Sequence, residues 1–213
     1  FVALCTGVSR RVVSYRTAIT GFPAASRWID RVAAWAGFYK KAVFVSDSVR
    51  HSAKAYPAKL LRTSATVHNG LLDFVPAECS VAEARQEFGI EQDRFVLLAA
   101  GRLAEQKNYM ILLEAMRRLE GCLLVIAGEG HLRGQMEAFV DAHGLRDKVR
   151  LLGRIEASLM PRLLRSADLF VQSSTFEGQS NAVLEALTSG VPVIAHDIPE
   201  QRELVESEGA LPG

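Results

Sequence analysis

The sequence has few of the patterns that mark disulfide-rich or metal-binding proteins. Its three cysteines, Cys5, Cys79 and Cys122, lie far apart and form no CxxC pair. An odd, scattered set of cysteines predicts free thiols in a reducing compartment. The five histidines show neither HxxxH nor HExxH spacing, which disfavours a zinc site built by the protein.

The sequence also lacks an excess of charge of one sign and lacks long apolar runs. The net charge of +1 gives no basic excess of the kind that a nucleic-acid-binding protein shows. No run reaches the roughly 18 apolar residues of a membrane span. The chain begins at Phe1 rather than methionine and stops at Gly213 in an expected loop. We therefore expect a part of a larger protein, with room for one domain and part of another.

From about residue 93 onward, short apolar runs alternate with amphipathic stretches. Continuous apolar runs are typical of strands covered on both faces, and the stretches between them show helical spacing. This alternation predicts an α/β, Rossmann-like, doubly wound parallel sheet, with ligands bound beyond the carboxyl ends of its strands. The expected strands are Phe95–Ala100, Leu123–Ala127, Val149–Leu152, Leu169–Gln172 and Val191–Ala195.

Residues 1–75 are less regular. Strands are expected at Val12–Tyr15 and Ala42–Val45, with a helix at Ser26–Lys41 between them. A further short strand leads into the turn signal His68-Asn69-Gly70 and a linker. We interpret this part as the end of a first α/β domain.

A basic turn, GRLAEQKN at 101–108, follows the first apolar run. Gly101 lets the backbone approach a ligand closely. Arg102 can grip a phosphate through two parallel N–H groups, and Lys107 adds a point charge. The pair suits a diphosphate; the alternative is two solvated charges near the start of a helix.

Two acids flank the start of a later helix, in the stretch TFEGQSNAVLEALTSG. Glu177 lies on the loop, and Glu185 lies one to two turns inside a helix expected to begin near Ser180, where Ser180 and Asn181 are suitable capping residues. The N–H groups of such a helix start form an anion site. Glu177 is placed to hold sugar hydroxyls and Glu185 to accept from a ribose. The alternative is a capping acid and a surface acid.

A third turn, GEGHLRG, starts at Gly128 and narrowly misses the dinucleotide fingerprint, because it has one residue too many before its last glycine. Arg154 ends the next strand and would suit the 2′-phosphate of a nicotinamide cofactor. The alternative is a strand-to-helix turn that lines the crevice.

The segment 27–41 places Trp28, Val32, Trp35 and Tyr39 at helical spacing among basic residues. Such a stripe is typical of a helix that faces a core. The alternative is a helix that lies in a membrane interface.

Taken together, these stretches resemble the retaining, nucleotide-sugar-dependent glycosyltransferases of group 1, which have two facing Rossmann-like domains (the GT-B fold). GRLAEQKN, LLVIAGEGHLR, VRLLGR and ADLFVQSSTFEGQSNAVLEALTSGVPVIA match the family in order and spacing, from about Phe95 to the end. The resemblance implies that residues 1–75 are a C-terminal remnant of the acceptor-side domain with its linker. Residues 76–213 would be the donor-binding domain, truncated at its C-terminal helices.

The resemblance also implies roles for single residues. Arg102 and Lys107 would bind the donor diphosphate, Glu177 the donor sugar and Glu185 the ribose; the first three are the expected catalytic residues. The backbone of Gly153–Ile155 would hold the base, and amides at Gln179–Ala182 would meet sugar and phosphate. The other expected substrate-binding residues are Gly101, Gly128, Arg154, Ile155, Gly178, Gln179, Ser180, Asn181 and Ala182.

Two positions depart from the family. Ser180 stands where most members have proline, and a small polar residue keeps the helix start. In the segment VVSYRT, Arg16 stands at or near the place where many members carry a catalytic-region histidine. Arg16 would then bind an acceptor phosphate.

The implied function is transfer of a sugar from a nucleotide-diphosphate sugar, such as a UDP-sugar or GDP-sugar, with retention of configuration. The resemblance implies no cofactor and no required metal. A saccharide or lipid-linked acceptor, bacterial polysaccharide or glycolipid synthesis, and a cytoplasmic location with peripheral membrane contact are expected, with no nucleic-acid partner. The alternatives are an inactive nucleotide-sugar-binding module, an isomerase or phosphorylase on the same scaffold, and a nicotinamide-dependent oxidoreductase.

Overall fold

The computed structural model describes residues 10–71 and 73–208, and these form two compact units. Unit 1 comprises Phe1–Gly70, Phe176–Gln179 and Ile198–Gly213, and unit 2 comprises Leu71–Thr175 and Ser180–Asp197. Unit 1 therefore takes in two short segments from the second half of the chain. The expected domain boundary after residue 75 concerns the longer protein and stays a prediction.

Unit 2 is built on a parallel sheet of five strands in the order β6-β5-β4-β7-β8. This is the doubly wound arrangement that the alternating sequence pattern predicts, because the strand order turns back at β4. The strands are β4 (Phe95–Ala100), β5 (Cys122–Ala127), β6 (Val149–Gly153), β7 (Leu169–Gln172) and β8 (Val193–Ala195).

The strand bounds agree closely with the prediction, with one correction. β4 and β7 have the predicted bounds, whereas β8 begins at Val193 instead of Val191. Pro192 explains the difference, since proline has no N–H to donate to the ladder. Its carbonyl still accepts from the Phe170 N–H at 2.8 Å.

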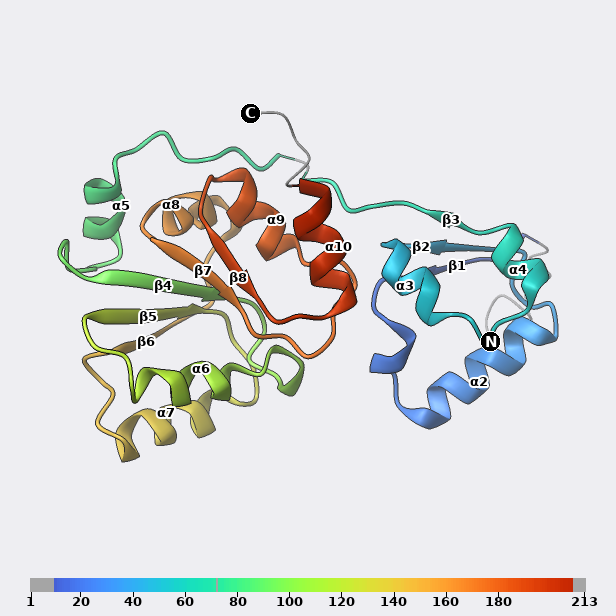
Figure 1. Cartoon of the computed structure of the whole chain (residues 1–213), viewed down its shortest axis with the longest axis horizontal. Helices are drawn as coiled ribbons and strands as arrows, with labels where there is room; N and C mark the ends of the chain where they lie inside the picture. Colours follow the sequence, from blue (N-terminus) through green and yellow to red (C-terminus); the bar gives the residue numbers. More distant parts are fainter. Residues whose placement is uncertain (1–9, 72, 209–213) are drawn as a thin grey trace. The chain divides into compact units, whose positions relative to one another are not determined.

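Helices cover both faces of this sheet (Figure 1). α6 (Tyr109–Met116) and α7 (Arg133–Ala142) lie on one face, and α5 (Val81–Glu87), α8 (Met160–Arg165) and α9 (Asn181–Thr188) lie on the other. The helical apolar stripes point into the core, as their spacing predicts. Fully buried members include Tyr109, Leu113, Met116 and Met136.

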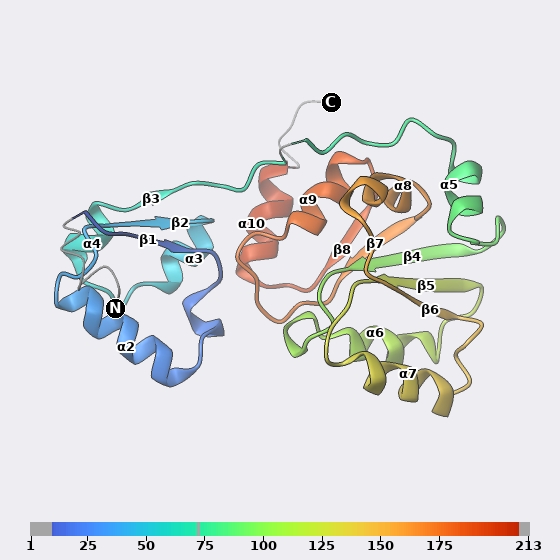
Figure 2. The same ribbon diagram turned by 180° about the vertical axis from the view of Figure 1, so that it is seen from behind.

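Unit 1 contains a smaller parallel sheet in the order β1-β2-β3. Its strands are β1 (Val12–Tyr15), β2 (Lys41–Phe44) and β3 (Ala65–Thr66). Its helices include α2 (Ala24–Trp35), α3 (Asp47–Ser52), α4 (Ala58–Arg62) and α10 (Pro199–Glu208), and α10 packs against α3. Seen from behind in Figure 2, α2 runs along one side of this sheet.

The first helix of unit 1 corrects two expectations. α2 ends at Trp35 rather than at Lys41, because Gly37 adopts a left-handed φ of 71°. The Phe38 N–H then donates to the Ala33 carbonyl at 3.0 Å, which closes a Schellman cap. The aromatic stripe of α2 does not face a core: Trp28 and Trp35 are each 67% exposed.

The structure also tests the expectation of free thiols and the expectation that the chain contains no membrane span. Cys79 and Cys122 are free thiols, as predicted. Cys5 and the two chain ends, Phe1 and Gly213, lie outside the described residues. In the part of the chain that the structure describes, no helix is long and apolar enough to cross a membrane.

Candidate functional site

Three neighbouring strands of unit 2 finish in glycine at the same edge of the sheet. Gly101 follows β4, Gly128 follows β5 and Gly153 ends β6, with positive φ angles of 144°, 147° and 76°. The Gly101 N–H donates to the Ala127 carbonyl at 2.9 Å, and the Gly128 N–H donates to the Gly153 carbonyl at 2.7 Å. GRLAEQKN, GEGH and GRIE therefore follow strands of unit 2 that end at one edge of the sheet.

Close packing explains why these positions hold glycine. A Cβ on Gly128 would lie 1.9 Å from the Gly101 carbonyl oxygen, and a Cβ on Gly130 would lie 2.2 Å from the Leu103 carbonyl oxygen. The GEGH turn therefore packs directly on the turn after β4. This packing accounts for both glycines without a dinucleotide cofactor.

The switch point of the sheet lies at β4, between β5 and β7. Ligands of open α/β sheets bind at such a point. The turn after β4 and the loop after β7 are tied together there. Ser173 Oγ donates to the Lys107 carbonyl at 2.7 Å, and the Thr175 N–H donates to the Gln106 carbonyl at 2.9 Å.

Arg102 and Lys107 lie at this end of β4. Lys107 is half-buried and ends the short 3₁₀ turn η2 (Glu105–Lys107). Its ammonium group lies over the strand end, since a Cβ on Gly101 would be 3.3 Å from Lys107 Nζ. The Arg102 side chain is exposed and forms no hydrogen bond or ion pair with any other residue that the structure describes. Two cations at a glycine-ended strand suit a diphosphate.

A second contact fixes the turn after β4. His131 Nε2, from the GEGH turn, lies 2.9 Å from Glu105 Oε1. The hydrogen bond to His131 is the main cause that lowers the pKa of the exposed Glu105 carboxyl. The cations therefore stand on a turn that is held from two sides, by His131 and by Ser173.

α9 begins at Asn181 with Ser180 as the N-cap residue, as predicted. The expected side-chain cap is absent within the described structure: Ser180 Oγ makes no cap bond and instead lies 3.2 Å from Gln172 Nε2, which donates to it. Gln172 Nε2 also donates to Ser174 Oγ at 3.0 Å. The Ser180 side chain therefore does not cap the first-turn N–H groups of α9.

Sequence reasoning missed Gln172 and Ser173. Gln172 is only 1% exposed, and its side chain sets the position of the Ser180 hydroxyl. The available signal was the change from apolar to polar residues at the carboxyl end of a buried strand. That is where polar groups can reach a ligand or hold the residues that do.

Glu185 lies on α9, one turn after its start, as predicted. The side chain is half-buried, and burial raises the pKa of its carboxyl. A partly desolvated carboxylate gains from hydroxyl donors, which suits a ribose diol. Next to it on the helix, Ala182 is half-buried and Asn181 is exposed.

Arg154 and Ile155 follow the glycine end of β6. Arg154 is exposed and Ile155 is half-buried. The Gly153 backbone is close to the Glu129 carboxylate, since a Cβ there would lie 2.8 Å from Glu129 Oε1. Arg133 pairs with that same Oε1 at 2.8 Å. The Glu129–Arg133 pair therefore lies against the backbone at the end of β6, which the exposed Arg154 follows.

Glu177, Gly178 and Gln179 belong to unit 1. The Ala18 N–H donates to the Glu177 carbonyl at 3.0 Å, and Ser46 Oγ donates to the Gly178 carbonyl at 3.1 Å. The Glu177 residue is only 7% exposed. This loop therefore lies against the residues that follow β1 and β2.

Arg16 follows β1 and touches the same loop. A Cβ on Gly178 would lie 1.8 Å from the Arg16 carbonyl oxygen, so only glycine fits at this position. The Arg16 side chain is exposed and donates to Asn69 Oδ1 at 3.3 Å. Asn69 also donates its N–H to Gln179 Oε1 at 2.5 Å. Arg16 thus stands at a strand end beside the loop that carries Glu177.

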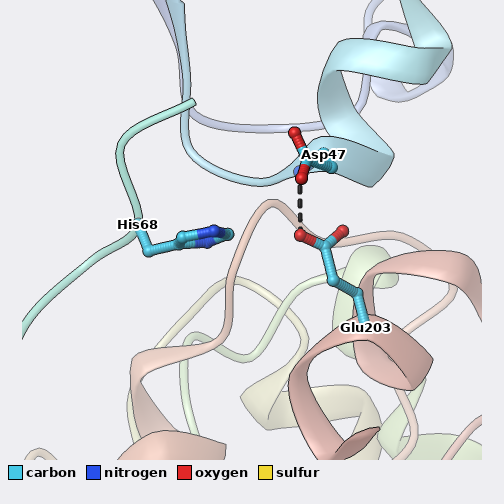
Figure 3. Close-up of side chains that lie close together, drawn as sticks. All are labelled: Asp47, His68 and Glu203. Carbon is cyan, nitrogen blue, oxygen red and sulfur yellow. Dashed lines mark hydrogen bonds between the residues drawn. The ribbon is translucent and has the colours of Figure 1, made fainter. Parts of the chain in front are cut away.

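Asp47, His68 and Glu203 form a further polar cluster in unit 1 (Figure 3). Their possible ligand atoms lie within 4.8 Å of one another. The Glu203 carboxylate accepts from the Asp47 and Ser48 N–H groups at 2.8 and 2.7 Å, at the start of α3. Its geometry is that of a cap supplied by α10, which satisfies helix donors.

Comparison with known proteins identifies the family. The family model described as "Glycosyl transferases group 1" matches residues 80–210. The chain belongs to the group 1 glycosyltransferases. The match includes the glycine-ended strands, both predicted cations and both glutamates of the candidate site.

Relatives in this family are longer than the chain. The chain is 31% identical to alpha-D-kanosaminyltransferase of Streptomyces kanamyceticus over 84% of its own length and 50% of that protein. It is 31% identical to alpha-monoglucosyldiacylglycerol synthase of Streptococcus pneumoniae over 62% of its length and 31% of that enzyme. The chain thus spans half or less of these relatives.

Solved structures show the same fold. HepE from Anabaena, in a crystal structure with UDP and glucose, superposes with a TM-score of 0.83 at 20% identity. The match covers 96% of this chain and 57% of HepE. The fold is therefore of the GT-B class, as the sequence predicts.

Proposed function

We propose that the protein transfers a sugar from a nucleotide-diphosphate sugar to an acceptor, with retention of configuration. The observation that carries this proposal is the edge of unit 2 where β4 ends. Arg102 and Lys107 stand there beside three glycine-ended strands, at the switch point of the sheet. Family membership makes a sugar donor the natural occupant.

In this proposal the donor is held by its diphosphate and its ribose. Arg102, Lys107 and the N–H groups at the start of α9 bind the diphosphate, with Gly101 allowing close approach. Glu185 accepts from the ribose hydroxyls. The backbone near Gly128 and the loop at Gly153–Ile155 hold the base, with Arg154 at its edge.

The donor sugar and the transfer step follow from the remaining residues. Glu177 orients the sugar through its hydroxyls, and Gly178, Gln179, Ser180, Asn181 and Ala182 contribute backbone contacts to sugar and phosphate. The bond between the anomeric carbon and the β-phosphate oxygen breaks, and its electron pair leaves with the diphosphate. The acceptor oxygen forms the new bond on the same face, and its proton passes to the departing phosphate oxygen.

Arg102, Lys107 and the helix start are the electrostatic part of the mechanism. Fixed cations and helix N–H groups stabilise the charge that develops on a leaving diphosphate. We therefore propose that the reaction requires no metal and no cofactor.

The acceptor side of the proposal rests on relatives and on Arg16. By their names, one relative above transfers a kanosaminyl group and the other forms monoglucosyldiacylglycerol, a lipid product, which supports a lipid-linked acceptor beside the proposed saccharide one. UDP is the first nucleotide to test, because HepE was solved with it. Arg16 is proposed to bind an acceptor phosphate. We place the protein in the cytoplasm, in bacterial polysaccharide or glycolipid synthesis.

The test is a thermal-shift and calorimetric titration with UDP, GDP and ADP. One nucleotide is expected to raise the melting temperature, because ligand at 100 times its dissociation constant adds about 2.7 kcal/mol to the stability of the folded state. Lys107→Ala should weaken binding about ten-fold or more, since a hydrogen bond to a charged group contributes roughly 1.5–3 kcal/mol. Lys148→Ala is the matched control, because Lys148 pairs with Glu120.

Turnover by the full-length protein separates the remaining alternatives. Release of free sugar from the bound donor, with the anomer read by NMR before mutarotation, reports both activity and stereochemistry. Binding without any turnover would leave the inactive binding module, and an inverted anomer would overturn retention. Unchanged nucleotide binding in both the Lys107→Ala and the Arg102→Ala variant would overturn the diphosphate assignment.

A further inference from the structure

Three helices that the structure describes have serine as their N-cap residue, and one of these serines does not cap its helix. At the start of α3, Ser46 Oγ accepts from the Val49 N–H at 3.2 Å. At the start of α5, Ser80 Oγ accepts from the Glu83 N–H, also at 3.2 Å. At the start of α9, Ser180 Oγ makes no such bond. A serine in this position normally accepts from the second or third N–H of its helix.

Gln172 holds the Ser180 hydroxyl elsewhere. Gln172 Nε2 donates to Ser180 Oγ at 3.2 Å and to Ser174 Oγ at 3.0 Å. A side-chain amide carries two N–H donors, so the two serines use both. All three residues are buried, with exposed fractions of 1% for Gln172, 5% for Ser180 and 0% for Ser174. Release of either hydroxyl would leave a buried donor without its acceptor, so the contact is a stable part of the fold.

We propose that Gln172 is a positioning residue of the nucleotide site: it holds Ser180 Oγ away from the start of α9, so that the first-turn N–H groups bind the donor diphosphate. A side-chain cap and a bound phosphate need the same N–H groups and therefore compete for them. This inference rests on the proposed function. It adds a residue that acts through Ser180 rather than by contact with the donor.

The place of Gln172 in the sheet supports this role. It is the last residue of β7, which pairs with β4 at the switch point. The next residue, Ser173, donates to the Lys107 carbonyl at 2.7 Å. Adjacent residues at one strand end therefore hold the two parts of the proposed diphosphate site, the turn with its cation and the start of α9. All of these residues belong to unit 2.

The test is a set of calorimetric titrations of the full chain with UDP and with uridine, which lacks both phosphates. Gln172→Met removes the amide donors and keeps an unbranched, adaptable side chain. Ser180 should then cap α9, and UDP should bind about five-fold more weakly, because a phosphate has to displace a typical serine cap. The affinity for uridine should not change. Damage to the core alone would lower the melting temperature without separating UDP from uridine.

A second background isolates the competing hydroxyl. In a chain that carries Ser180→Ala, Gln172→Met should cause no further loss of UDP affinity, because no hydroxyl remains to cap the helix. Ser174→Ala is the matched background, because Ser174 Oγ contacts the same amide but is not the N-cap residue of α9. There, Gln172→Met should still cause the five-fold loss. Equal losses in the two backgrounds would overturn the proposal, and so would a Gln172→Met variant that binds UDP like the unaltered chain.

Amide hydrogen exchange of the unaltered chain is a second test, which does not depend on how well a core variant folds. UDP should slow exchange of the first-turn amides of α9, and uridine should not. Absence of this protection, in a chain that loses UDP affinity on Lys107→Ala, would overturn the role of Gln172 and leave the cation site in place. Unchanged UDP affinity in both Lys107→Ala and Arg102→Ala would instead overturn the diphosphate assignment, and this inference with it.

Discussion

At the scale of single residues, Gly128 shows how tightly the edge of unit 2 is packed. Its φ is 147°, and a Cβ at this position would lie 1.9 Å from the Gly101 carbonyl oxygen, which leaves no room for any other residue. Gly128→Ala is expected to cost about 2–3 kcal/mol of folding free energy, through strain and backbone displacement. Urea unfolding followed by circular dichroism measures this cost. Gly134→Ala is the control, since a Cβ there meets nothing within 4 Å.

Glu185 links stability to pH. Burial raises the pKa of its carboxyl above the ordinary value of about 4.3. The stability that the group contributes is therefore fully present below pH about 4.3 and is lost as pH rises through the raised pKa of the folded state. Glu185→Gln cannot ionise, so it should melt at a higher temperature than the unaltered chain at pH 7. The two melting temperatures should converge at acid pH.

The same variant tests the ribose role. Glu185→Gln should bind UDP about ten-fold more weakly, because hydrogen bonds to a charged acceptor are stronger than those to an amide. Dideoxy-UDP, which lacks both ribose hydroxyls, is the control ligand. Calorimetry should find its affinity equal in both proteins. If the variant weakened both ligands alike, the carboxylate would not contact the ribose.

At the scale of elements, a partly buried ion pair holds α5 to the start of β7. Arg85, whose side chain is 6% exposed, pairs with Asp168 at 2.7 Å and donates to the Ser166 and Gln92 carbonyls. Arg85→Ala should destabilise unit 2 by about 2 kcal/mol, because it removes the side-chain donor from the buried Ser166 carbonyl, whereas Asp168 keeps the Val96 N–H as a donor. The exposed pair Arg117 and Glu114 provides the control, with an expected loss below about 0.5 kcal/mol for Arg117→Ala. Chemical unfolding compares the two.

The positions of the strands could be predicted from the sequence, whereas the orientation of one helix could not. The strands of unit 2 could be predicted because a buried parallel strand leaves an uninterrupted apolar run, as at Phe95–Ala100. The orientation of α2 could not, because periodicity shows that a helix has an apolar face but not where that face points. Its partners, Tyr15 and Tyr56, lie far away in sequence. The polar contacts around Gln172 escaped prediction because they too depend on how the chain folds back on itself.

At the scale of the whole molecule, the reaction is expected to be independent of metal. Donor turnover by the full-length protein should be unchanged by EDTA and not stimulated by Mg²⁺ or Mn²⁺, because Arg102, Lys107 and α9 supply the positive charge. Loss of activity in EDTA with recovery in Mn²⁺ would contradict this. His68→Ala would then show whether the cluster of Asp47, His68 and Glu203 is the ligand set.

The glycine-ended edge of unit 2 limits how the proposed donor site can change. A side chain at Gly128 would collide with backbone, and one at Gly101 would displace Lys107. Neither position can therefore acquire a new contact during evolution or in a mutant library. A change of base preference has to come from a freer position nearby, such as Arg154, which is exposed. Selection experiments for a new nucleotide should accumulate substitutions there and leave the glycines untouched.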